Sequence, residues 1–279
     1  MIWRCRHRIL DLERPAVMGV LNITPDSFFD GGRYSQLGRA LDRAARIVAE
    51  GASIIDVGGE STRPGSAGVD EAVEMERVIP VIESISERFD IAISVDTSKL
   101  GVMAAAVAAG ASIVNDVYAL RAAGARQWAA STAVGVCLMH MQGEPRTMQE
   151  DPHYDDVVAE VVTFLQSERE ACIAAGIGAE AIALDPGIGF GKSLAHNLTL
   201  LRDLSSLVAL GSPVLVGVSR KSLIGRVLGG LPLEERLHGG LGLAALAVAM
   251  GAKIIRTHDV APTVDAIRMV DAVLRGRET

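Results

Sequence analysis

Cysteine is scarce in this sequence, and the few cysteines present are scattered. The chain has 279 residues and only three cysteines, Cys5, Cys137 and Cys172, an odd number with wide spacing. Such spacing matches neither a disulfide framework nor a zinc site. The six histidines do not cluster at metal-ligand spacing either. The sequence therefore disfavours a hydrolytic zinc site of the kind that amidohydrolase barrels carry.

Long apolar runs and a basic charge balance are also missing. No apolar run approaches the roughly 20 residues that span a bilayer, and no leader-like segment precedes the first apolar stretch. The net charge of −7 disfavours nucleic acid and membrane surfaces as partners, but it allows a local basic pocket for an anionic small molecule. We therefore expect a cytoplasmic globular protein, with 49% hydrophobic residues to form its core.

One segment partly matches the motif of a nucleotide-binding loop, but the match is incomplete. Residues 183–193 read ALDPGIGFGKS, and a phosphate-binding loop needs glycine where Pro186 stands, a residue with no N–H to offer a phosphate. The dinucleotide fingerprint fails too, because its third glycine would fall on Lys192. The segment instead predicts a buried strand that ends in an acid, Asp185, followed by a glycine-rich loop.

What the chain does contain is a repeated unit. Residues 50–56, 109–115 and 250–256 each follow an alanine-rich helical stretch with a glycine, a β-branched run and a polar residue. The same pattern predicts eight apolar strands, at about 16–21, 52–57, 91–95, 111–115, 133–139, 181–184, 213–218 and 252–256. Apolar strands that alternate with helices favour a closed (β/α)8 barrel, with a doubly wound sheet as the alternative. We expect a single domain over 1–279, with 1–14 as a hairpin or cap under the barrel.

Polar residues follow every one of these predicted strands. Barrel active sites lie at the carboxyl ends of the strands, so these residues are the candidates for a site. Acids and amides follow the second, third, fourth and sixth strands, and cations follow the seventh and eighth, which favours a ligand with a donor-rich ring at one end and anionic groups at the other. The set is Asn22, Asp56, Asp96, Asn115 with Asp116, His140, Asp185, Ser219 with Arg220 and Lys221, and Arg256 with His258. A Schiff-base aldolase is disfavoured, because Lys221 lies past the seventh strand rather than inside the sixth.

In this order, the motifs resemble those of the dihydropteroate synthases, the pterin-binding barrels of folate biosynthesis. The resemblance covers about residues 17–272, through MGVLNITPDSF (18–28), GESTRPG (59–65), NDV (115–117), LMHMQG (138–143), DPGIGFGK (185–192), SRKS (219–222) and RTHD (256–259). Phe29 and Gly240 depart from the family pattern, in which serine is usual at both positions. Neither position is associated with catalysis, although Phe29 could alter how the first loop closes.

The resemblance implies a transferase that joins 6-hydroxymethyl-7,8-dihydropterin diphosphate to 4-aminobenzoate and releases diphosphate. The pterin edge would be read by Asp185, Asn115 and Asp96, with Lys221 on the pterin carbonyl and ring nitrogen. Asp96 and Asp185 would also stabilise a cationic methylene formed as the C–O bond breaks, so Asp96, Asp185 and Lys221 are the implied catalytic residues.

The remaining implied residues bind the diphosphate and the second substrate. Arg63, Arg256 and His258, with Thr62, would hold the diphosphate, and Mg²⁺ held through Asn22 would add positive charge. Thr62, Pro64, Phe190, Lys221 and Ser222 would bind aminobenzoate, whose carboxylate suits the N–H of Ser222 at the start of a helix. The resemblance also implies a homodimer formed by late barrel helices. A pterin-dependent methyltransferase and a non-catalytic pterin-binding paralogue are the alternatives.

Overall fold

The computed structural model describes residues 1–23, 33–61, 68–144 and 147–276 of the chain. The strands are β1 Ile2–Cys5, β2 Arg8–Asp11, β3 Ala16–Asn22, β4 Ile54–Gly58, β5 Ala92–Asp96, β6 Ile113–Asp116, β7 Gly135–Met139, β8 Ile182–Asp185, β9 Leu215–Gly217 and β10 Ile254–Thr257. The helices are α1 Arg33–Ala49, α2 Glu71–Arg88, α3 Leu100–Ala108, α4 Ala125–Thr132, α5 Val157–Ala174, α6 Leu194–Arg202, α7 Ser205–Val208, α8 Ser222–Val227, α9 Leu237–Ala249 and α10 Val260–Arg275, with single 3₁₀ turns at Ala179–Ala181 and Leu233–Glu235.

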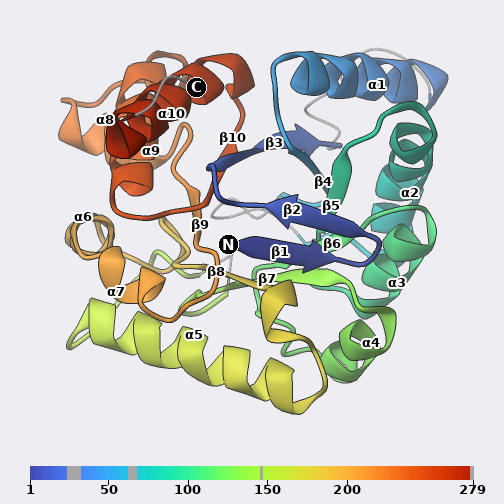
Figure 1. Cartoon of the computed structure of the whole chain (residues 1–279), viewed down its shortest axis with the longest axis horizontal. Coiled ribbons are helices and arrows are strands. Elements are labelled where there is room, and N and C mark those ends of the chain that lie inside the picture. Colours follow the sequence, from blue (N-terminus) through green and yellow to red (C-terminus); the bar gives the residue numbers. More distant parts are fainter. Residues whose placement is uncertain (24–32, 62–67, 145–146, 277–279) are drawn as a thin grey trace.

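Strands β3 to β10 form a parallel barrel inside a ring of helices (Figure 1). The sheet order is β8-β7-β6-β5-β4-β3-β10-β9, so each strand lies beside its neighbours in the sequence and β3 pairs with β10. An isolated bridge between Leu184 and Val214, next to the hydrogen bond from Leu184 N to the carbonyl oxygen of Pro213, links β8 to the β9 side. This order confirms the predicted (β/α)8 barrel and excludes the doubly wound sheet, whose strand order would reverse direction.

The eight predicted strands are all present, within two residues of their predicted bounds. Several begin later than predicted, because the first residues of each repeat still belong to the turn that leaves the preceding helix. The glycine in that turn has φ of 92° at Gly51, 119° at Gly110 and 104° at Gly251, the left-handed region in which glycine is favoured. The repeated pattern in the sequence is therefore a repeated helix end.

The antiparallel hairpin of β1 and β2 covers the amino-terminal end of the barrel and crosses its centre in Figure 1. One face of the hairpin packs into a separate apolar cluster with the first residues of the barrel strands, among them Met18, Ile54 and Ala183. Trp3 is fully buried there, and its Nε1–H donates to the carbonyl oxygen of Ala181 over 3.0 Å. The predicted hairpin under the barrel is thus confirmed, and it leaves the carboxyl ends of the strands as the open end.

Replacing Trp3 with phenylalanine should destabilise the fold without changing the open end of the barrel, where the strands have their carboxyl ends. The change leaves the buried carbonyl of Ala181 without its donor and opens a void, which together lower the free energy of unfolding by about 1–3 kcal/mol. Urea titration followed by circular dichroism measures this loss. Trp128→Phe is the matched control, because Trp128 is only partly buried. An equal loss in both variants would contradict a special role for the hairpin contact.

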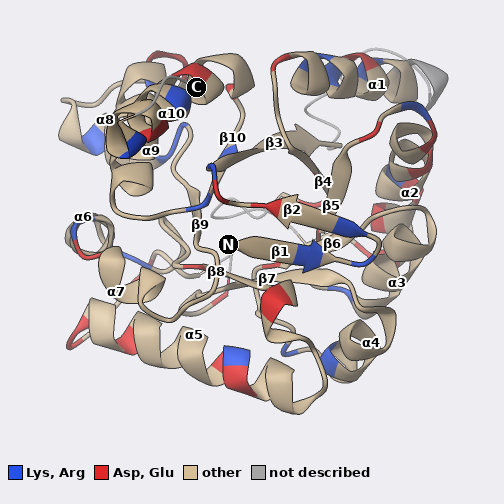
Figure 2. Cartoon of the chain, in the orientation of Figure 1, with Lys and Arg blue, Asp and Glu red and all other residues tan. Residues whose placement is uncertain are grey.

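Acidic and basic residues are interspersed around the ring of helices (Figure 2). Among the described residues, no helix is long and apolar enough to cross a membrane.

Candidate active site

Arg256 in β10 joins carboxylates from two other strands at the open end of the barrel. Its Nε donates to Asp56 Oδ2 over 2.7 Å, and its Nη2 donates to Asp96 Oδ2 over 2.6 Å. Asn115 Nδ2 donates to the same oxygen of Asp56 over 3.3 Å. The structure therefore places Asp96, Asn115 and Arg256 together, while their roles in ligand binding stay predictions.

Asp56 is the central residue of this group. Its place among the strand-end candidates was predicted, but no role in binding or catalysis was. Its side chain is fully buried in β4, and its Oδ1 accepts no hydrogen bond from the residues that the structure describes. An unpaired buried carboxylate oxygen is costly, so this atom is a candidate to accept from a ligand. The sequence did hold a signal for it, because Asp56 interrupts the apolar run 52–58, and an acid within a buried strand is rare unless it is paired.

The barrel end gathers acids and cations from several strands. Asp56, Asp96 and Asp185 interact with Arg256 and Lys221, and Lys192 also faces Asp185. Burial raises the pKa of Asp96 to about 7, against the opposing effect of Arg256 and with further help from Asp56. Burial likewise lowers the pKa of Lys221 to about 8. The site therefore suits a ligand that brings N–H donors or positive charge.

Asp185 ends β8 and is held by its own loop. Its Oδ1 accepts from the backbone N of Gly187 over 2.7 Å, and burial raises its pKa although Lys221 opposes the shift. Gly187 has φ of 64°, and a Cβ there would lie 2.0 Å from the carbonyl oxygen of His140. Only glycine fits this turn, which presses the loop against the end of β7 and fixes the carboxylate at the strand end.

Lys221 and Phe190 form the second half of the site. Lys221 Nζ donates to the carbonyl oxygen of Ile188 in the same glycine-rich loop and lies 4.5 Å from the centre of the Phe190 ring. Phe190 also packs against Met139 and Met141 from the end of β7. A flat apolar face thus lies beside an ammonium, which suits an aromatic carboxylate.

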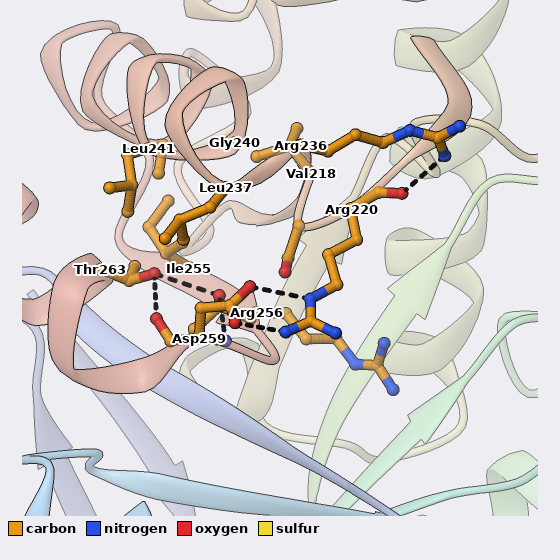
Figure 3. Close-up of a pocket in the computed structure, with 13 residues that line it drawn as sticks. Val218, Arg220, Arg236, Leu237, Gly240, Leu241, Ile255, Arg256, Asp259 and Thr263 are labelled. Atoms are coloured by element: carbon orange, nitrogen blue, oxygen red, sulfur yellow. Dashed lines mark hydrogen bonds and ion pairs between the residues drawn. The ribbon is translucent and has the colours of Figure 1, made fainter. Parts of the chain in front are cut away.

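The predicted anion-binding end contains fewer available cations than the residues after the seventh and eighth strands suggested. His258 N and Nδ1 both lie 3.2 Å from Ser219 Oγ, so these two strand ends meet. Arg220 does not join them, because its Nη2 and Nε lie 2.6 and 3.0 Å from the carboxylate of Asp259 (Figure 3). Arg220 therefore ties the loop after β9 to the start of α10, rather than serving as a free cation.

A small pocket lies beside this ion pair, between the ends of β9 and β10 and helices α9 and α10 (Figure 3). Gly240 lines it, and a Cβ at Gly240 would lie 3.8 Å from Ile224 Cδ1 and 3.9 Å from Ser219 Cα. A serine would fit at this position without displacing its neighbours. The departure from the family pattern at Gly240 therefore leaves space rather than forcing a rearrangement.

Asn22, the predicted metal ligand, ends β3 next to the bare backbone of Gly58. A Cβ on Gly58 would lie 3.5 Å from Asn22 Oδ1 and 3.8 Å from Asp96 Oδ2. The described residues contain no group of three histidine, cysteine or acidic side chains that could hold a metal ion. This donor set fits Mg²⁺ only in the form that takes one or two protein oxygens and completes its shell with phosphate and water.

Four residues of the sequence-based predictions lie outside the described residues: Thr62, Arg63, Pro64 and Phe29. Ser222 is described, and it is the first residue of α8, where N–H groups have no acceptor within the helix. Its neighbour Lys221 is the residue at the N-cap. The proposed carboxylate site at Ser222 therefore adjoins the ammonium of Lys221.

Comparison with known proteins identifies the class of enzyme. The pterin binding enzyme family matches residues 18–258. Dihydropteroate synthase of Escherichia coli strain K12 is 52% identical over 269 residues, covering 96% of this chain and 95% of the relative. The crystal structure of Yersinia pestis dihydropteroate synthase with a sulfonamide drug complex shares 49% identity at a TM-score of 0.93, covering 99% and 100% of the two chains. The structure of Xanthomonas albilineans dihydropteroate synthase with 4-aminobenzoic acid shares 48% sequence identity at a TM-score of 0.92, covering 98% of each chain.

The chain therefore belongs to the pterin binding enzyme family, whose barrel and strand-end site it carries. Within that family it belongs with the dihydropteroate synthases, which are transferases. The resemblance of the sequence motifs to this family is confirmed.

Proposed function

We propose that the open end of this barrel binds a dihydropterin diphosphate and joins it to 4-aminobenzoate, releasing diphosphate and forming 7,8-dihydropteroate. The observation that carries the proposal is the set of acceptors at the strand ends: Asp56 and Asp185, which are buried, and Asp96, which is mostly buried, with Asn115 beside them. A pterin edge presents adjacent N–H donors, and buried carboxylates accept such donors with charge-assisted strength. The Oδ1 of Asp56, which has no partner among the described residues, agrees with that preference.

The same residues account for the chemistry. Breaking the C–O bond to diphosphate leaves a cationic methylene on the dihydropterin, and the amine of aminobenzoate then attacks it. Asp96 and Asp185 would stabilise that charge, and no side-chain nucleophile is needed. Lys221 would orient the pterin carbonyl, while Phe190 and Ser222 would position aminobenzoate against the methylene.

The diphosphate would lie toward Arg256 and His258, with Thr62 and Arg63 from the segment outside the described residues. Magnesium would be held through Asn22 and would supply positive charge to the leaving group. Arg256 already pairs with Asp56 and Asp96, so it would serve the carboxylates and the anion together.

The decisive test incubates the purified chain with both substrates and Mg²⁺ and looks for dihydropteroate and diphosphate in equal amounts. Omitting Mg²⁺ and adding a chelator should suppress product formation. Transfer of a methyl group from a methylated pterin to a corrinoid protein would support a methyltransferase instead. Pterin binding without any product would support a non-catalytic protein.

Pterin binding should depend on pH through Asp96. Its pKa is raised to about 7 in the free protein, yet it must be ionised to accept from the pterin. Binding should therefore release close to one proton at about pH 6 and almost none at about pH 8, and the affinity should fall about tenfold per unit below pH 7. Calorimetry of a hydroxymethyl pterin in buffers with different ionisation enthalpies counts these protons. Asp96→Asn should abolish the release, and proton release that persists in this variant would contradict the assignment.

We also propose that the chain is a homodimer in the cytoplasm. Three neighbouring late helices expose large apolar side chains, namely Val227 and Leu228 at the end of α8, Leu246 on α9, and Met269, Val273 and Leu274 on α10. Val273 is the most exposed of these, at 75%. Sedimentation should report a dimer that Val273→Glu converts to a monomer, whereas Val73→Glu on α2 should leave the mass unchanged. Cell fractionation tests the location.

A further inference from the structure

Lys192, the lysine of the incomplete nucleotide loop, points into the protein rather than toward a ligand. Only 2% of the residue is exposed. Its ammonium lies 2.9 Å from His140 Nδ1 and 3.3, 3.1 and 3.0 Å from the carbonyl oxygens of His140, Gly187 and Phe190. A buried charge with four acceptors from two loops is a built site, and the reaction itself gives it no role.

The imidazole of His140 acts as an acceptor in this site. Burial, followed by the charge of Lys192, lowers the pKa of His140 to about 3, so the ring is neutral. The ring packs against Phe164 on α5 in a T-shaped arrangement, with centroids 4.9 Å apart, which restricts the rotation of the imidazole. The lone pair of Nδ1 therefore faces the ammonium. Burial lowers the pKa of Lys192 to about 7, against the opposing charge of Asp185, and the four acceptors favour its charged form.

The acceptors belong to the segments that carry the two halves of the active site. Gly187 orients Asp185 through its N–H, and Phe190 presents the apolar face beside Lys221. The contact between the two loops is close, because a Cβ on Gly191 would lie 2.2 Å from the carbonyl oxygen of Gln142. Three carbonyl oxygens also lie within 3.3 Å of the same ammonium, and oxygens gathered in this way repel one another unless a cation lies between them.

We propose that Lys192 is a positioning residue, whose ammonium acts as a resident cation that holds the Asp185–Phe190 loop against the end of β7 in the shape that binds both substrates. The proposal rests on the proposed function, since it concerns how the same site is held. Phe190 is attached to the ammonium through its own carbonyl, whereas Asp185 is also held by its strand. Loss of the cation should therefore affect aminobenzoate more than the pterin.

The test compares Lys192→Met, which keeps the length of the side chain and removes its charge, with Trp3→Phe, which destabilises the far end of the barrel. The KM for aminobenzoate should rise about tenfold to a hundredfold in Lys192→Met, and pterin affinity should fall by a smaller factor. The KM should stay within about twofold of wild type in Trp3→Phe, even at the same loss of thermal stability. An unchanged KM in folded Lys192→Met would overturn the proposal.

A pair of variants at His140 keeps the proposal testable if Lys192→Met does not fold. His140→Asn keeps an acceptor near the place of Nδ1, and His140→Leu removes it at similar volume. His140→Leu should raise the KM for aminobenzoate severalfold, and His140→Asn should restore it toward the wild-type value. Equal KM values in the two variants would overturn the proposal. Failure of the proposed function is recognised separately, because the wild-type chain would then form no dihydropteroate.

Discussion

Asp185→Asn should abolish useful pterin binding while leaving the barrel folded. The asparagine oxygen can still accept from the backbone N of Gly187, as Asp185 Oδ1 does over 2.7 Å. That choice turns the amide nitrogen toward the ligand, so a donor faces the N–H donors of the pterin edge. A lost charge-assisted bond and a mispaired buried donor each cost about 1–3 kcal/mol, which together predict a loss of affinity of at least about thirtyfold. Calorimetric titration with a pterin measures it.

The matched control is Asp116→Asn. Asp116 is also a buried acid that ends a strand, but its two oxygens accept from the backbone N of Tyr118 and of Leu120, over 2.9 and 2.8 Å. We expect Asp116→Asn to lower stability with little change in the pterin affinity of the folded protein. Unchanged affinity in folded Asp185→Asn, or an equal loss in both variants, would show that the pterin is bound elsewhere.

The barrel could be predicted from the sequence because its determinants are local. A strand buried on both faces needs an unbroken apolar run, and each helix that ends in Gly51, Gly110 or Gly251 marks where the next run begins. Trp3 and Cys5 alternate with polar residues in 1–14, so the hairpin was also readable. None of these features depends on a partner that is distant in the sequence.

The candidate site was predicted only in part, because its pairings join residues far apart in the chain. Residue types at strand ends showed where ligand-binding groups would gather, but not that Arg256 contacts Asp56 and Asp96, which are 200 and 160 positions away. Arg220 shows the same limit, since a cation in a cation-rich motif is ion-paired with Asp259. Lys192 shows it most clearly, because the letters of a phosphate-binding loop hold a lysine that binds carbonyl groups of its own protein.

Removing the charge of Arg256 should lower both the free energy of unfolding and the affinity for the pterin diphosphate, and a second substitution should separate the two effects. Arg256→Met leaves Asp56 and Asp96 buried without their shared cation, which predicts a loss of about 3–5 kcal/mol in the free energy of unfolding. Adding Asp56→Asn removes one of the two unpaired charges, so the double variant should recover much of that stability.

The effect of Arg256 on binding should not recover with the stability. Because the guanidinium lies at the anion end of the site, both Arg256→Met and the double variant should bind the pterin diphosphate far more weakly than wild type. The loss should be much smaller for the bare hydroxymethyl pterin, which has no diphosphate to contact a cation. Parallel calorimetric titrations of the two ligands into the single and the double variant measure the difference. If both ligands lose affinity by the same factor, Arg256 serves only to hold the two carboxylates; a loss confined to the diphosphate, and retained in the stabilised double variant, assigns the leaving group to Arg256.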